Sequence, residues 1–314
     1  MRRPFRVRLL GALLAPALIA LAACGSEGGT DVAAATGGVT VTHAQGSTTL
    51  PATPEKVVVF DLGVLATLDE LGVEVAGVPA IENLPDKLAK YAGDDYTKVG
   101  SLFEPDFEKV NALDPDLIVV AGRSSPAYAE LAKIAPTVDL TVDNTKFLDS
   151  FRERTTALGT IFGKEAEVKQ RLDAIDNAVA EVKAKAGDRR GLVVLTTGGK
   201  ITAHGPGGRF GLVHDELGVR PAADGLKAET HGEAVSAEFI AKTDPDLLYV
   251  VDRDAAVGES GQAAKQVLDN ALIKGTKAAQ NDKIVYLDPF TWYLAPTALS
   301  SVDSMVEVIG DSLS

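Results

Sequence analysis

The chain has 314 residues, with 44 acidic and 31 basic side chains, a formal net charge of −13 at pH 7 and a single cysteine. An acidic excess of this size favours solubility and repels nucleic acid, which excludes a nucleic-acid-binding function. One cysteine cannot form an internal disulfide, and the length is enough for two modest domains held by hydrophobic cores.

The first residues have the composition of an export signal. Four arginines precede an apolar run from Leu9 to Ala23, which is shorter than the roughly 20 residues of a membrane-spanning helix. Leu21-Ala22-Ala23-Cys24 is similar to the lipobox of bacterial lipoproteins, in which cleavage precedes a cysteine that receives a lipid. We expect residues 1–23 to be a signal peptide and Cys24 to hold the protein to a membrane surface through its lipid. A free thiol behind an ordinary signal peptide is the alternative, and "RRPF" matches a twin-arginine export signal only in part.

Residues 24–54 are predicted to form a lipidated N-terminus and flexible tether, because "GSEGGTDVAAATGG" at 25–38 is Gly-rich and has no hydrophobic period. Beyond Pro54, short apolar runs alternate with helix-like segments. This alternation is typical of βα units with a mostly parallel sheet. It predicts an N-terminal α/β lobe over residues 55–163.

Residues 147–186 differ, because their apolar residues recur at helical spacing and are interrupted only at "IFGKE". We predict a helix, a break, and then one long connecting helix over residues 164–187. Strand-like runs return at 191–197, 247–251 and 284–287, which predicts a second α/β lobe over residues 188–314. The predicted fold class is therefore α/β, with two lobes of mostly parallel sheet joined by a single long helix.

A ten-residue phrase occurs twice, as "DPDLIVVAGR" at Asp114–Arg123 and as "DPDLLYVVDR" at Asp244–Arg253. The same offset pairs Glu108 with Glu238, so each copy reads as a helix with a glutamate, an Asp-Pro that ends it, and a buried strand. A common helix–strand connection with chance matches is the alternative explanation. Ligands of parallel sheets bind beyond the carboxyl ends of the strands. The two terminal arginines are therefore predicted to face a cleft and bind anionic oxygens.

Three further residues in the C-terminal half are candidates. Arg209 follows a glycine loop in "GPGGRF", which suits an anion but matches neither a P-loop nor a dinucleotide-binding pattern. His231 and Tyr293 lie between strands and helices, and imidazole nitrogen and phenolate can both bind Fe(III). Each of the three could equally be structural. No nucleophile elbow is present, and the only cysteine is assigned to the lipid, so no catalytic nucleophile is recognised.

Four segments together resemble a known family: "KVGSLFEPDFEKVNALDPDLIVVAGR", "TAHGPGGRFGLVHDELG", "THGEAVSAEFIAKTDPDLLYVVDR" and "LDPFTWYL". They are similar to the siderophore-binding lipoproteins of iron-uptake ABC transporters, in the branch that binds ferric catecholates of the enterobactin and petrobactin types. The resemblance runs from about Val57 to the C-terminus. It implies the class III substrate-binding-protein fold, with the ligand in a cleft between two lobes. His204 departs from the pattern, since a small or aromatic residue is expected there.

The resemblance also implies roles for single residues. An arginine triad would face the anionic chelate, His231 and Tyr293 would complete the iron shell of a tetradentate siderophore, and one glutamate per lobe would dock onto permease arginines. Trp292 adjoins Tyr293 and is counted with the ligand-binding residues. The implied set is Arg123, Arg209, Arg253, His231, Tyr293 and Trp292 for the ligand, and Glu108 and Glu238 for the permease.

The expected function is that of a monomeric, lipid-anchored receptor that delivers a ferric catecholate to an ABC permease. It would have no enzymatic activity and no intrinsic cofactor. We expect it on the outer face of the cytoplasmic membrane, at the surface of a single-membrane cell rather than in a periplasm. A receptor for haem or cobalamin, and a secreted hydrolase using Tyr293, His231 and an arginine, are the alternatives. Which siderophore binds, and whether both residues coordinate iron, stays open.

Overall fold

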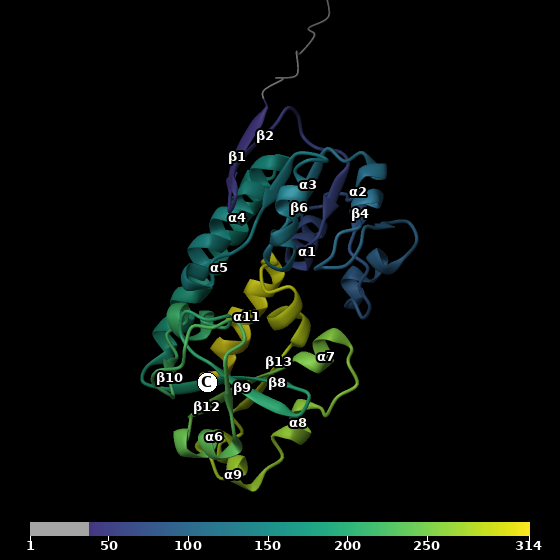
Figure 1. Cartoon of the computed structure of the whole chain (residues 1–314). Helices are drawn as coiled ribbons and strands as arrows, with labels where there is room; N and C mark the ends of the chain where they lie inside the picture. The colour runs from purple at the N-terminus through teal and green to yellow at the C-terminus, as the bar shows by residue number, and fades with distance from the viewer. Residues whose placement is uncertain (1–37) are drawn as a thin grey trace, which may run out of the picture. The chain divides into compact units, whose positions relative to one another are not determined.

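The computed structural model describes residues 38–314, which form one compact unit (Figure 1). The predicted signal peptide, Cys24 and the first part of the predicted tether lie outside the described residues. Within residues 38–314, no helix is both long enough and apolar enough to cross a membrane.

The predicted tether of residues 24–54 is too long. Strands β1 (Val39–His43) and β2 (Gly46–Leu50) pair as an antiparallel hairpin. The stretch "VTVTH" alternates β-branched residues, which favour strands, and Val41 and Leu50 are buried. The hairpin lies against the edge of the first sheet, where the Ala44 amide donates to the Asp139 carbonyl at 2.9 Å.

The first sheet has five parallel strands in the order β5-β4-β3-β6-β7. Its central strands are buried and rich in valine, as expected for a sheet covered on both faces. The strands are β3 (Val57–Val59), β4 (Gly77–Val78), β5 (Thr97–Lys98), β6 (Leu117–Val120) and β7 (Thr137–Asp139). Its helices and helical turns are α1 (Leu62–Glu70), η1 (Asp86–Ala92), α2 (Phe107–Leu113), η2 (Gly122–Ala127) and α3 (Tyr128–Leu131).

The second sheet has the order β11-β9-β8-β12-β13, with β10 also paired to β8. Strands β10, β12 and β13 run parallel to their neighbours, whereas β9 and β11 are antiparallel. The strands are β8 (Arg190–Thr197), β9 (Lys200–His204), β10 (Arg220–Pro221), β11 (Glu233–Val235), β12 (Leu247–Asp252) and β13 (Ile284–Leu287). Its short helices are η4 (Leu212–Glu216), α6 (Ala237–Thr243), α7 (Arg253–Val257), α8 (Ala264–Val267), α9 (Ala271–Lys274), α10 (Lys277–Gln280) and η5 (Phe290–Leu294).

A long helix connects the two sheets, as the sequence predicts. After the turn η3 (Asn144–Lys146), α4 (Phe147–Phe162) ends at Gly163, whose φ of 63° suits glycine, and α5 (Glu165–Ala186) follows. The C-terminal helix α11 (Leu299–Ser312) packs against α5 and α1. In Figure 1, α5 runs alongside both halves of the described unit. We call the half with the first sheet the N-terminal lobe and the half with the second sheet the C-terminal lobe.

The repeated phrase has the same structure in both lobes. Helices α2 and α6 end at Asp114 and Asp244, which adopt left-handed backbone with φ of 49° and 44°. The second aspartate of each phrase accepts a backbone N–H from the start of the neighbouring strand, Asp116 from Lys56 at 2.8 Å and Asp246 from Arg190 at 2.9 Å. The phrase therefore ends a helix and ties the next strand into its sheet.

Candidate functional site

Two of the predicted arginines stand at equivalent places in the two lobes. Arg123 lies in η2 directly after β6, and Arg253 begins α7 directly after β12. Both therefore follow the carboxyl end of a buried parallel strand, as the sequence predicts. Arg209 lies in the loop that follows β9 in the C-terminal lobe.

The three arginines gather around Tyr293, on η5. Arg123 Nη2 donates to the Tyr293 carbonyl at 2.7 Å, and its Nη1 donates to the Leu294 carbonyl at 3.3 Å. Arg209 Nη2 donates to the same Tyr293 carbonyl at 2.8 Å. The guanidinium carbons of Arg209 and Arg123 lie 4.0 and 5.4 Å from the centre of the Tyr293 ring. The Tyr293 carbonyl and the Tyr293 ring thus hold the two positively charged guanidinium groups close to each other.

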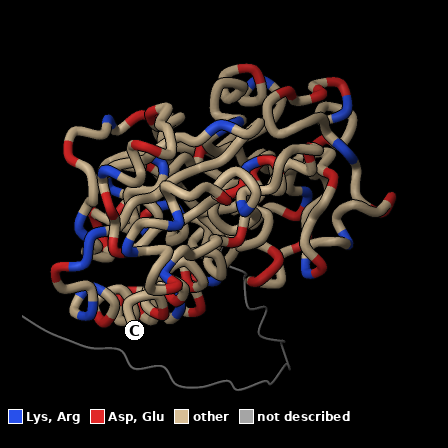
Figure 2. Tube along the Cα trace, turned by 90° about the horizontal axis from the view of Figure 1, so that it is seen from below, with Lys and Arg blue, Asp and Glu red and all other residues tan. Residues whose placement is uncertain are grey.

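Arg123 and Arg209 form no ion pair within residues 38–314. Burial lowers the pKa of Arg209, and the nearby charge of Arg123 lowers it further. Acidic and basic residues are intermingled along much of the chain (Figure 2). A guanidinium has five N–H donors. The carbonyls of residues 293 and 294 accept only a few of them, which leaves donors available for an anion.

The phenol of Tyr293 is affected by this cluster. Burial by itself would raise its pKa, but the charge of Arg209, a hydrogen bond from Arg253 and the charge of Arg123 outweigh burial, so the pKa lies below its ordinary value. A phenol that ionises more readily is a better ligand for a hard cation.

Arg253 differs from the other two arginines, because it already has acidic partners. Its Nη1 lies 2.7 Å from Glu259 Oε2 and 3.6 Å from Asp254 Oδ1. The hydrogen bond to Glu259 is the main reason why the pKa of Arg253 is raised. An anion that binds Arg253 must therefore compete with Glu259.

Arg123 and Arg209 both line a cavity of about 380 Å³. The rest of its wall includes Gly122, Thr141, Phe147, Thr230, Leu294 and Thr297, which come from both lobes. Asp61 also lines it, but its carboxylate caps α1 by accepting the Val64 amide at 3.0 Å, and burial raises its pKa. The cavity thus combines two cations, several hydroxyl groups and apolar surface.

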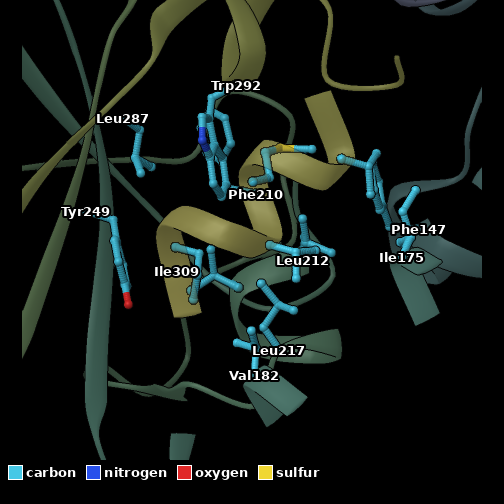
Figure 3. Packing of buried hydrophobic residues seen from close by; sticks show 14 of the residues in the cluster. Phe147, Ile175, Val182, Phe210, Leu212, Leu217, Tyr249, Leu287, Trp292 and Ile309 are labelled. Carbon is cyan, nitrogen blue, oxygen red and sulfur yellow. The ribbon is translucent and has the colours of Figure 1, made fainter. Parts of the chain in front are cut away.

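His231 and Trp292 lie differently from the arginines. His231 is exposed on the turn before β11, beside the cavity residue Thr230. Trp292 is only 2% exposed and points into the core near Phe210, with ring centres 6.3 Å apart (Figure 3). Trp292 is therefore part of the core and does not line the cavity. Among residues 38–314, no three histidine, cysteine, aspartate or glutamate side chains gather as a metal site.

Glu108 and Glu238 have matching positions. Each is the second residue of a short helix that ends at the repeated Asp-Pro, and each side chain is exposed. One acidic side chain per lobe is therefore presented to solvent on equivalent elements.

The sequence does not single out Thr141 and Thr230, and it marks His204 only as a departure from the family pattern. Thr141 and Thr230 line the cavity, but threonine is too common to be singled out by its type. His204 is 2% exposed, and its Nδ1 has no hydrogen-bond partner among the described residues. Burial, with smaller contributions from Arg209 and His231, lowers the pKa of His204 to about 4. Its ring is therefore neutral at pH 7.

Comparisons with known proteins bear on the family and the fold of the chain. A family model described as periplasmic binding protein matches residues 57–291. The chain is 47% identical over 281 residues to the petrobactin-binding protein YclQ of Bacillus subtilis (strain 168), covering 88% of each chain. It is 32% identical over 278 residues to the ferric-anguibactin-binding protein FatB of Vibrio anguillarum, covering 86% of each.

Two solved structures have the same fold. The crystal structure of YclQ matches with a TM-score of 0.83 at 46% identity, covering 88% of this chain and 99% of that one. The crystal structure of the periplasmic catecholate-siderophore binding protein VctP from Vibrio cholerae also gives a TM-score of 0.83, at 35% identity, covering 87% of this chain and 99% of that one. These likenesses confirm the predicted α/β fold of two lobes and the resemblance on which the sequence analysis relied.

Proposed function

The chain belongs to the periplasmic binding protein family, and from that premise we propose that it is an extracytoplasmic receptor that binds a ferric catecholate siderophore and delivers it to an ABC permease. The observation that carries the proposal is the convergence of Arg123 and Arg209 on the Tyr293 carbonyl without an ion-pair partner among the described residues. In an acidic chain, such a cluster selects an anionic ligand. The relative YclQ, 47% identical, is named for binding petrobactin.

The proposed binding mode follows from the donors at the cavity. The remaining N–H groups of Arg123 and Arg209 would donate hydrogen bonds to catecholate oxygens. Arg253 would add a third cation after its ion pair with Glu259 is broken. If the siderophore supplies only four oxygens to iron, Tyr293 and His231 would complete the octahedron. Support for Tyr293 comes from the Arg123 and Arg209 guanidinium groups next to its ring and from its lowered pKa. Support for His231 comes from its chain neighbour Thr230, which lines the cavity.

We further propose how the receptor is placed in the cell. Residues 1–23 would be removed and Cys24 lipidated, which anchors the protein to the outer face of the cytoplasmic membrane of a single-membrane cell. Glu108 and Glu238, one per lobe and both exposed, would dock onto basic side chains of the permease. The receptor would act as a monomer and carry out no reaction of its own.

Titration with ferric petrobactin tests the proposal. Trp292 is the only tryptophan and directly precedes Tyr293 in the chain, so a bound ferric catecholate should quench its emission with a submicromolar Kd. A ferric hydroxamate should not. Replacing Trp292→Phe should abolish the optical signal but leave the affinity measured by equilibrium dialysis of radioactive iron unchanged. No retention of iron from any ferric catecholate in dialysis would refute the function itself.

A further inference from the structure

A buried carboxylate lies next to the site without lining its cavity. Asp139, at the end of β7, is 0% exposed. Its Oδ1 accepts the Thr141 amide at 3.0 Å and the Thr141 hydroxyl at 2.5 Å. Its Oδ2 accepts the Ser125 hydroxyl at 2.5 Å and Gln45 Nε2 at 3.1 Å. Both oxygens are therefore fully used by neutral donors.

Two of these donors fix the turn that carries Arg123. Thr141 lines the cavity, and its Oγ1 accepts the Gly122 amide at 2.8 Å while donating to Asp139. Gly122 has a φ of 50°, the left-handed backbone that turns the chain as β6 ends. Ser125 holds the same turn two residues after Arg123. Asp139 therefore fixes the backbone on both sides of the arginine.

The charge of Asp139 makes these bonds strong. Burial would raise its pKa, but the hydrogen bonds from Ser125, Thr141 and Gln45 outweigh burial, and the pKa lies below its ordinary value. The group is therefore ionised at neutral pH. An ionised carboxylate accepts only, so every donor around it must point toward it, and charge-assisted bonds are stronger than neutral ones. A hydrophobic residue at this sheet edge would give packing without this orientation.

We propose that Asp139 is a positioning residue of the ligand site, which acts through Ser125 and Thr141 to hold the Gly122–Arg123 turn so that Arg123 reaches the Tyr293 and Leu294 carbonyls. This inference rests on the proposed function, because its readout is siderophore affinity. Asp139 makes no ligand contact in this role. Its third partner residue, Gln45, belongs to the N-terminal hairpin and donates to Asp139 at 3.1 Å, with only a longer contact of 3.4 Å to the Ser125 hydroxyl of the turn, so it serves as the control.

The first test compares Asp139→Asn with Gln45→Ala, using ferric petrobactin and dialysis. In Asp139→Asn an NH2 group replaces one of the two carboxylate oxygens. This NH2 group cannot accept hydrogen bonds, so either the bonds from Ser125 and Gln45 or the bonds from Thr141 are lost. We expect about a tenfold weaker affinity. Gln45→Ala removes one bond to the same carboxylate and the long contact to the Ser125 hydroxyl, but leaves the short Ser125 and Thr141 bonds to Asp139 in place, so the affinity should stay within about twofold of the wild type. Equal affinity losses in both variants would show that the contact from the hairpin matters as much as the contacts to the turn, and would overturn the positioning role.

A double-mutant cycle separates positioning from general damage. If Asp139 acts through Arg123, Asp139→Asn should weaken binding in the wild type but by less than about twofold in an Arg123→Ala background. If Asp139→Asn lowered the affinity by the same factor in the wild type and in the Arg123→Ala variant, the inference would be wrong. Should Asp139→Asn not fold, Ser125→Ala replaces it in the same cycle, with about a threefold loss expected in the wild type alone.

Failure of the proposed function is distinguishable from failure of this inference. A wild-type protein that retains no ferric petrobactin refutes the function, and the positioning role with it. A wild type that binds, with an Asp139→Asn variant of equal affinity and normal thermal unfolding, refutes the positioning role alone.

Discussion

Replacing Arg209→Ala gives the sharpest test of the cation cluster. In the structure the guanidinium is buried, lies over the Tyr293 ring and donates to a backbone carbonyl, next to the like charge of Arg123. No acidic side chain pairs with it among residues 38–314. Its charge therefore does little for the folded state and is available to a ligand.

The expected size of the effect follows from two estimates. A charge-assisted hydrogen bond contributes about 1.5–3 kcal/mol, and two unit charges about 5 Å apart attract each other by about 3 kcal/mol at an effective dielectric constant of about 20. The loss of Arg209 should therefore weaken ferric petrobactin binding by about 2–3 kcal/mol, or about 30- to 150-fold. The free energy of unfolding should change by less than about 1 kcal/mol, because relief of repulsion from Arg123 offsets the lost contact with the Tyr293 ring.

Affinity by equilibrium dialysis and stability by urea unfolding measure the two quantities separately. Arg220→Ala is the control, because Arg220 is exposed and pairs with Asp188 on the surface at 2.7 Å. Its affinity should stay within about twofold of the wild type. Raising the ionic strength should weaken binding less in Arg209→Ala than in the wild type. An Arg209→Ala protein that binds normally, or that loses as much stability as affinity, would refute the reasoning.

Three further predictions concern the surroundings of the cluster. Glu259→Gln should strengthen ferric petrobactin binding about threefold, because Glu259 occupies Arg253 in the absence of ligand; weaker binding in dialysis would show that Glu259 supports the site instead. Glu108→Ala and Glu238→Ala should leave the Kd unchanged and reduce cellular uptake of radioactive iron more than about tenfold, whereas loss of binding would contradict a docking role. The pKa of His204 is about 4 in the folded protein and about 6.5 when unfolded. Its contribution to stability is therefore fully present above pH 6.5 and is lost as the pH falls toward 4, by up to about 3 kcal/mol. In His204→Phe, the free energy of unfolding measured with urea should fall less between pH 6.5 and 4 than in the wild type. The same pH dependence in both proteins would count against a neutral buried His204 ring.

Parts of the fold could be predicted because their causes are local. Apolar runs and helical spacing give the alternation of strands and helices, and Gly163 marks the break before α5. The doubled phrase placed Arg123 and Arg253 correctly after their strands, since Asp-Pro ends a helix by its own geometry. The hairpin of residues 39–50 was missed although "VTVTH" alternates, because the Gly-rich composition of the preceding residues was extended too far.

The arrangement of the candidate site could not be predicted in the same way. The group that gathers two arginines is the carbonyl of Tyr293, and a backbone carbonyl has no sequence signature. Asp139 is one of 44 acidic residues, and only the fold shows that its oxygens hold Ser125 and Thr141. Trp292 was grouped with the ligand residues because it adjoins Tyr293, but neighbours in a helical turn point in different directions.

Tyr293 lies where the hydrophobic cores of the two lobes meet, since its side chain packs against both. Arg123 comes from the N-terminal lobe and donates to carbonyls of the C-terminal half of the chain, whereas Arg209 shares a lobe with η5. The two cations are therefore not equivalent. Arg209 adds charge to the cavity, while Arg123 adds charge and also joins the lobes at the cavity wall. If Arg123 binds the ligand as proposed, ligand affinity and the relative position of the lobes would be coupled through Arg123, and the Asp139 network that holds its turn would contribute to both.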